Sequence, residues 1–250
     1  MKPSLFNALI PSFSNVFIWL NAILMLVGIF VLGWEPEVVI IAYFLETIII
    51  GVIHVFKLLV VLRFGAQQGI DPTKKDVFSG FSVIPFFILH YFFFIFVQSI
   101  FIFEMLEDMI PSENGSFNVF SNYAYLLSQH DVFMAFLTLA FSNVAMTFKN
   151  FILPGEFRRT TTSKLYFQPY VRIFIQQFVT IFAWFFMFLS SSAMAAALLI
   201  IIFRLIVDLF LNKASMDKTF KAQLMTRLKK NQKFEDAEQT EKSFDSFLEK

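Results

Sequence analysis

The stretch PEVVIIAYFLETIIIGVIHVFKLLVVL, residues 36–62, decides the fold class. A membrane hydrocarbon core about 30 Å thick is crossed by about 20 helical residues, so this stretch is long enough to span it. Its extra length predicts a helix that tilts or projects beyond the core. Pro36 suits the first turn of a helix, where its missing N–H removes no hydrogen bond. The stretch therefore indicates a transmembrane helix.

The same length criterion selects five further stretches, which are residues 13–32, 81–103, 132–153, 170–189 and 193–211. Pro154-Gly155 ends the fourth span in chain order, and Pro169 precedes the fifth. Only Ser190, Ser191 and Ser192 separate the last two stretches, so a re-entrant pair is the alternative there. We predict an all-α fold, a polytopic bundle of six transmembrane helices over residues 1–212, followed by a charged tail over residues 213–250.

Composition supports a membrane protein. The chain is 57% apolar and 16% charged, with a mean hydropathy of +0.67, whereas soluble domains carry about 25% charged residues. Phenylalanine supplies 38 of the 250 residues and suits lipid-facing and helix-packing positions. The chain has no cysteine, which excludes disulfides, iron–sulfur clusters, thiolate zinc sites and cysteine nucleophiles.

The distribution of Lys and Arg predicts the orientation, because cytoplasmic loops carry the excess of basic residues. The first and third connections contain acids and no Lys or Arg, whereas the second and fourth contain Arg63, Lys74, Lys75, Arg158, Arg159 and Lys164. We therefore expect both termini in the cytoplasm and the chain in the inner (plasma) membrane. In the acidic third connection, the aromatic residues of segment 117–127 predict an interfacial helix.

The tail has two halves of opposite charge. Residues 213–233 hold seven basic groups and one acid, and residues 234–250 hold six acids and two lysines. Met216, Phe220, Leu224 and Leu228 recur every four residues, which predicts an amphipathic cytoplasmic helix. We expect this helix to bind anionic membrane lipid through its basic side chains, Lys218, Lys221, Arg227, Lys229 and Lys230. We expect no nucleic-acid partner, and a homo-oligomer stays open.

Polar side chains inside the predicted spans are the candidate site, because ionisable groups in a bilayer are costly and usually face protein or water. Helical depth, at about 1.5 Å per residue, places most of them in one layer of the cytoplasmic half. We expect Glu46, near the midplane, to reach Arg204 through His90 or water rather than as a close pair. His54 shares one broad face with Glu46. The candidate residues are Glu46, His54, His90, Tyr91, Asn143, Gln176, Arg204 and Asp208.

Three functions fit this layer. The polar groups pack and assemble the helices by hydrogen bonds and ion pairs, or they line a cytoplasm-open cavity for a small solute, an ion or a proton. The third alternative is a membrane-embedded enzyme or cofactor protein using Glu46, His54 and His90. No dinucleotide, Walker, zinc-protease or nucleophile-elbow motif occurs, so no enzyme class is indicated. We predict no metal and no cofactor, with a haem between His54 and His90 as the alternative.

Three segments carry a resemblance to a known family. They are AYFLETIIIGVIHVFK (residues 42–57), PFFILHYFFFIFVQSIFI (85–102) and RLIVDLFLNK (204–213). They resemble an uncharacterised bacterial family of polytopic inner-membrane proteins described only as a domain of unknown function, over most of the membrane part and not the tail. The resemblance implies importance for Glu46, His90, Tyr91, Arg204 and Asp208. It implies no activity.

Overall fold

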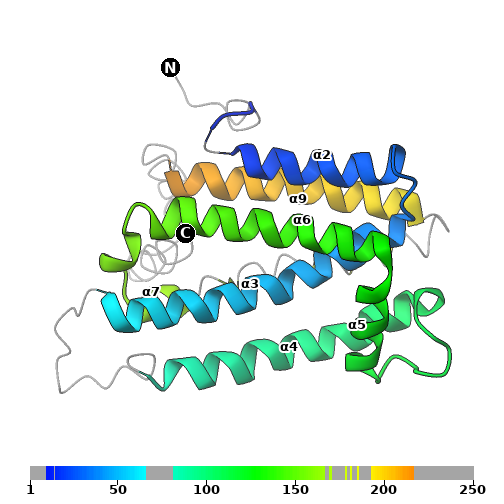
Figure 1. Cartoon of the computed structure of the whole chain (residues 1–250), viewed down its shortest axis with the longest axis horizontal. Coiled ribbons are helices and arrows are strands. Elements are labelled where there is room, and N and C mark those ends of the chain that lie inside the picture. The colour runs from blue at the N-terminus through cyan, green and yellow to red at the C-terminus, as the bar shows by residue number, and fades with distance from the viewer. Residues whose placement is uncertain are drawn as a thin grey trace, which may run out of the picture.

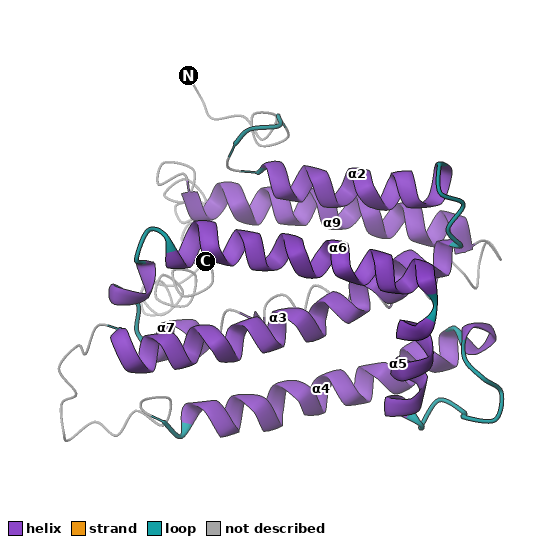
Figure 2. Ribbon diagram, viewed as in Figure 1, coloured by secondary structure: helices purple, strands orange, loops and turns teal. Residues whose placement is uncertain are grey.

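The computed structural model describes residues 10–13, 15–65, 81–166, 169–170, 178, 181, 185 and 193–216. These residues form helices, turns and loops without a strand (Figure 2). The helices are α2 Val16–Phe30, α3 Pro36–Phe64, α4 Val83–Met105, α5 Val119–Ser128, α6 His130–Thr147, α7 Thr162–Tyr166 and α9 Ala193–Met216. Two 3₁₀ turns, Glu107–Met109 and Glu156–Arg158, and a π turn, Phe148–Ile152, join them. The predicted all-α class is confirmed for this part of the chain.

Four helices are long and apolar enough to cross a membrane, namely Pro36–Phe64, Val83–Met105, His130–Ile152 and Ala193–Phe210. They correspond to four of the six predicted spans. The first predicted span is the shorter apolar helix α2, with 15 residues. The fifth lies outside the described residues apart from Tyr170, Phe178, Ile181 and Phe185. The number of crossings therefore stays a prediction.

The long helices lie side by side, and α5 runs across one end of them (Figure 1). Helix α3 is central, because it contacts α4, α6, α7 and α9. Helix α2 packs on α6 and α9. A helix is confirmed at the segment predicted to be interfacial, since α5 covers Val119–Ser128.

Helix direction separates the basic and acidic connections. Helices α3, α6 and α9 all end at the same end of the bundle, and α2 begins there (Figure 1). Arg63 lies in the last turn of α3 and Lys213 in the last turn of α9. The acidic connection Glu104–Asp131 lies at the opposite end, with α5. The predicted separation of charge is present for the described residues, and the compartment at each end stays a prediction.

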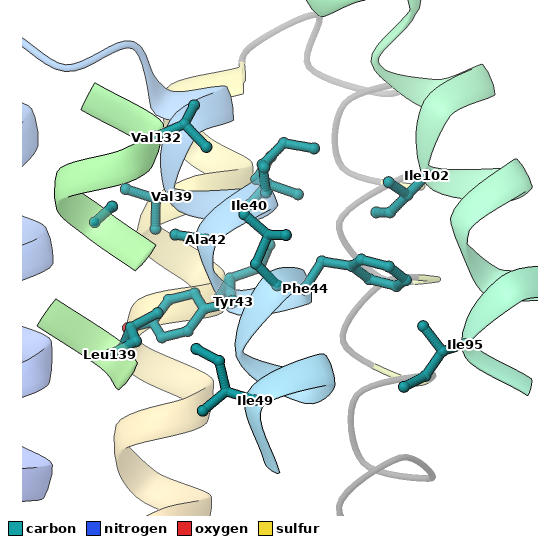
Figure 3. Close-up of a cluster of buried hydrophobic side chains, with 14 of the residues drawn as sticks. Val39, Ile40, Ala42, Tyr43, Phe44, Ile49, Ile95, Ile102, Val132 and Leu139 are labelled. Atoms are coloured by element: carbon teal, nitrogen blue, oxygen red, sulfur yellow. The ribbon is translucent and has the colours of Figure 1, made fainter. Parts of the chain in front are cut away.

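Residues 38–45 of helix α3 are apolar on all sides, which suits its central place. Residues from Val38 to Thr47 are buried without interruption. Figure 3 shows the ring of Tyr43 beside Leu139 of α6 and the ring of Phe44 turned toward Ile95 and Ile102 of α4. Neighbouring residues of α3 therefore contact different helices.

Helix α4 buries one face against α3 and presents phenylalanine and leucine on the other. Leu89 is 74% exposed, Phe93 61% and Phe101 66%. A continuous exposed apolar face of this kind is unusual on a soluble protein. It suits contact with hydrocarbon.

Tyr91 fixes the contact between α3 and α4. Its hydroxyl donates a hydrogen bond of 2.8 Å to the Thr47 carbonyl. Its ring lies against Gly51, where a Cβ would collide with ring carbons. Glycine at this position allows the two helices to approach closely.

Local polar contacts set the bounds of α2. The backbone N–H of Ser12 donates to the Asn15 side chain at 2.7 Å, and Asn15 Nδ2 donates to the Ile10 carbonyl at 3.0 Å. This turn starts the helix later than the apolar run does. After the helix, Gly33 has a φ of 73°, and Trp34 packs back on Gly28.

Candidate functional site

Four polar residues from three helices meet in the bundle interior, and we call them the polar cluster. They are Glu46 of α3, Asn143 of α6, and Arg204 and Asp208 of α9. Glu46 is 1% exposed. Its Oε1 accepts a hydrogen bond of 2.7 Å from Asn143 Nδ2, and its Oε2 forms an ion pair with the Arg204 guanidinium. Both carboxylate oxygens of Glu46 therefore have partners, each from a different helix.

The direct Glu46–Arg204 pair differs from the expected bridged contact. Glu46 lies ten residues after Pro36, where α3 begins, and Arg204 lies eleven residues after Ala193, where α9 begins. Both helices begin at the same end of the bundle, so the two side chains are level. The predicted depths of Glu46 and Arg204 were counted from the opposite ends of their helices. That count was wrong, because α3 is longer than a membrane span, which shifts the depth of Glu46 by more than one turn.

Arg204 sits between two acids and an aromatic ring. Its Nε lies 3.7 Å from Oδ2 of Asp208, one turn further along α9. Its guanidinium carbon lies 4.4 Å from the centroid of the Tyr43 ring, a cation–π distance. The side chain of Arg204 is 11% exposed, and that of Asp208 is 20% exposed. Exposure therefore increases from Glu46 to Arg204 to Asp208.

Asn143 is held in position by its own helix. Its Nδ2 also donates to the Leu139 carbonyl at 2.8 Å, one turn earlier in α6. The Thr147 hydroxyl donates to the Asn143 carbonyl at 2.9 Å, one turn later. Contacts within α6 therefore orient the amide toward Glu46, without help from α9.

His54 lies away from the polar cluster. Its side chain is buried, and its ring packs on Phe87 of α4, with centroids 5.0 Å apart. Glu46 and His54 were expected on one broad face of α3. Because α3 is central, they contact different helices instead: Glu46 contacts α6 and α9, and His54 contacts α4. Lys57, further along α3, has its Nζ 5.3 Å from the centroid of the Phe151 ring.

His90 and Tyr91 belong to an aromatic group between α4 and the residues that follow α7. The Nδ1 atom of His90 is 2.9 Å from the Tyr170 hydroxyl. The His90 ring stacks on Phe86 at 5.7 Å and meets Phe94 edge-on at 5.3 Å. The expected bridging role of His90 between Glu46 and Arg204 is therefore replaced by the direct pair. The haem alternative for His54 and His90 stays a prediction.

The remaining predicted site residues lie outside the described part of the chain. Gln176 is one, and the lipid-binding positions of the tail are the others, namely Lys218, Lys221, Arg227, Lys229 and Lys230. Tyr43 was missed. It precedes Glu46 by three residues, so the spacing that places side chains on one helix face would have identified it.

A second polar contact lies near the acidic end. Ser99 of α4 donates to the Ile95 carbonyl at 2.6 Å, and its Oγ is 2.7 Å from the Tyr123 hydroxyl of α5. Burial raises the pKa of Tyr123 above its usual value, because the phenolate would lose hydration. This phenol therefore stays protonated and acts as a hydrogen-bonding group that joins α5 to α4.

The chemistry open to the polar cluster follows from its charges. Two carboxyl groups flank one guanidinium in a region of low exposure. Such a group can hold helices together. Among the described residues, no three His, Asp and Glu side chains are grouped as metal ligands.

Comparison with known proteins gives a family and no activity. No curated protein matches the chain, and no solved structure matches it. A family described as a family of unknown function, DUF6498, matches residues 4–239. The match extends through most of the charged tail, further than the three resembling segments suggested. It covers nearly the whole chain, and the protein therefore belongs to the DUF6498 family.

Proposed function

We propose that this chain is a multi-pass membrane protein in which the polar cluster packs and assembles the helices. One observation carries the proposal. The enclosed Glu46 carboxylate is bound on one oxygen by α6 and on the other by α9. In hydrocarbon, van der Waals packing and polar contacts between helices replace the hydrophobic effect as the association force. A carboxylate bound by two other helices therefore ties three helices at one point.

The membrane context belongs to the same proposal. The chain lies in the inner (plasma) membrane with its basic connections, and hence both termini, in the cytoplasm. The basic half of the tail rests on anionic lipid. These statements rest on the charge distribution of the sequence. They are supported by the position of the acidic connection, which lies at the end of the bundle opposite to the ends of α3 and α9.

A second function is favoured by Asp208. This second acid competes for the Arg204 guanidinium and is more exposed than Glu46. Protonation of either acid would leave Arg204 paired with the other, so the arginine could alternate between them. The polar cluster would then serve a cytoplasm-open pathway for a proton or a small ion.

A double-mutant cycle separates the two functions. The variants are Glu46→Gln, Arg204→Gln and both together, compared by thermal unfolding in detergent and by proton flux into liposomes. An assembly role predicts that each single variant loses about 3–5 kcal/mol, because the survivor is left as an unpaired buried charge. The double variant then recovers much of that loss.

A pathway role predicts the opposite pattern. Each single variant would unfold near the native temperature and lose flux. Asp208→Asn separates the roles further, because it leaves the Glu46–Arg204 pair in place: an assembly role predicts near-native stability, whereas a pathway role predicts lost flux. Normal stability in both single variants would overturn the assembly proposal.

A further inference from the structure

A groove on the flank of the bundle lies between α2 and α6, and we call it the outer groove. Its volume is about 300 Å³, at the lower end of the range for small-molecule sites. Four of its lining residues are apolar, and the other three are polar. Residues that line it include Leu20, Asn21, Leu24, Thr138, Phe141 and Ser142.

Two residues that line this groove each carry a buried side-chain oxygen without a hydrogen-bond partner among the described residues. These oxygens are Oδ1 of Asn21 and Oγ of Ser142. The Ser142 side chain is 2% exposed. Thr138 differs, because its hydroxyl already donates to the Met134 carbonyl at 3.0 Å. Buried polar atoms in native proteins nearly always have a partner, so Asn21 and Ser142 each lack a group that the described residues do not supply.

Depth limits what that group can be. Ser142 lies twelve residues after His130 and ten before Ile152, the bounds of the apolar helix. At about 1.5 Å per residue, it is about 15 Å or more from either end of that helix. Phospholipid headgroups lie outside the hydrocarbon core and do not reach this depth. The missing partner must therefore enter from within the hydrocarbon layer.

The hydrogen-bonding chemistry of Asn21 Oδ1 and Ser142 Oγ further limits which chemical group can be the missing partner. Asn21 Oδ1 only accepts hydrogen bonds, whereas Ser142 Oγ both donates and accepts. A hydroxyl is the simplest neutral group that can donate to one atom and accept from the other. The apolar wall, with Phe141 73% exposed and Leu20 43% exposed, suits the hydrocarbon body that carries the hydroxyl.

We propose that the outer groove binds a membrane-soluble alcohol, with its hydroxyl on Asn21 and Ser142 and its hydrocarbon body along Leu24 and Phe141. This site is separate from the polar cluster, and it rests on the proposed membrane placement of the chain but not on the role proposed for the cluster. The ligand class is a neutral hydroxyl on an apolar skeleton.

The test uses the full chain in liposomes and a photoreactive C15 isoprenoid alcohol as the probe. Its matched control is the methyl ether of the same probe, which accepts hydrogen bonds and cannot donate them. We expect the alcohol to label peptides of α2 and α6 at least fivefold more than the ether. Unlabelled alcohol should compete, and unlabelled ether should not. Equal labelling by the two probes would overturn the proposal.

Variants of the groove residues test whether the preference for the alcohol over the ether arises at Asn21 and Ser142. Ser142→Ala and Asn21→Leu should reduce the alcohol labelling to the level of the ether, whereas Thr138→Val should leave the preference intact. Competition on the native protein decides the question even where a variant fails to fold. The absence of native cysteine allows a second test, in which Phe141→Cys reports contact with another copy. Disulfide-linked dimers formed in liposomes would assign the outer groove to a protein partner and overturn the alcohol site.

Discussion

Ser142 and Asn143 are neighbours on α6, yet they lie in two regions with opposite polar chemistry. Asn143 enters the polar cluster, where it hydrogen-bonds to Glu46 and to its own helix. Ser142 faces the outer groove, where its hydroxyl has no partner among the described residues. One step of about 100° around a helix separates the two environments. The comparison teaches that burial and pairing are distinct properties, since both side chains are buried.

The largest expected effect comes from removing the positive charge of the polar cluster. Arg204→Leu should lower the free energy of unfolding by about 3–5 kcal/mol, because Glu46 becomes an unpaired buried charge. Denaturant titration in mixed micelles measures this change. Arg204→Lys is the control, since it keeps the charge and should lose less. Equal losses in the two variants would show that guanidinium geometry, rather than charge, holds the cluster.

A smaller effect is expected from the amide. Asn143→Leu should lower the free energy of unfolding by about 1.5–3 kcal/mol, the range for hydrogen bonds to charged groups. The same titration measures it. Leucine has a similar size and stays in the bundle interior, so the loss reports the hydrogen bond to Glu46. A change below about 0.5 kcal/mol would mean that Arg204 alone satisfies Glu46.

Substitution of Tyr43, whose ring lies against Arg204, tests the contribution of an aromatic neighbour to the polar cluster. Tyr43→Leu should lower the free energy of unfolding by about 1 kcal/mol, because the cation–π contact with Arg204 is lost. Tyr43→Phe keeps the ring and should retain that contact. A loss in the phenylalanine variant equal to that in the leucine variant would assign the effect to the hydroxyl instead.

The smallest effect is expected in the outer groove. Ser142→Ala should change the free energy of unfolding by less than about 0.5 kcal/mol in detergent without added alcohol, because the Ser142 hydroxyl has no hydrogen bond among the described residues. Thr138→Ala on the same helix is the comparison, since Thr138 bonds to Met134. A loss above about 1 kcal/mol for Ser142→Ala would reveal a bound partner that persists in detergent.

The length of the apolar stretches predicted which segments form helices. It predicted less well where each helix begins and ends. Pro36 begins α3 as predicted, because proline restricts the backbone by itself. Helix α2 begins at Val16, three residues later than predicted, since the turn held by Asn15 interrupts an apolar run. Hydropathy does not record such side-chain-to-backbone bonds.

The site was predictable in its members and less so in its arrangement. The rarity of charges in apolar spans identified Glu46, Arg204 and Asp208. Their depth was misjudged because α3 extends beyond one end of the bundle. Which neighbour each face of α3 meets depends on helix packing, and so the separation of His54 from Glu46 could not be read from helical angles alone.

The contact between Gly51 and Tyr91 has a mechanical consequence. Because the ring lies against a glycine backbone and its hydroxyl bonds to Thr47, rotation of α3 or α4 about its own axis would break this contact. The Glu46–Arg204 pair couples α9 to α3. Helix α2, which borders the outer groove, takes part in neither the Gly51–Tyr91 contact nor the Glu46–Arg204 pair. Any opening motion of this bundle should therefore begin with α2 swinging away from α6.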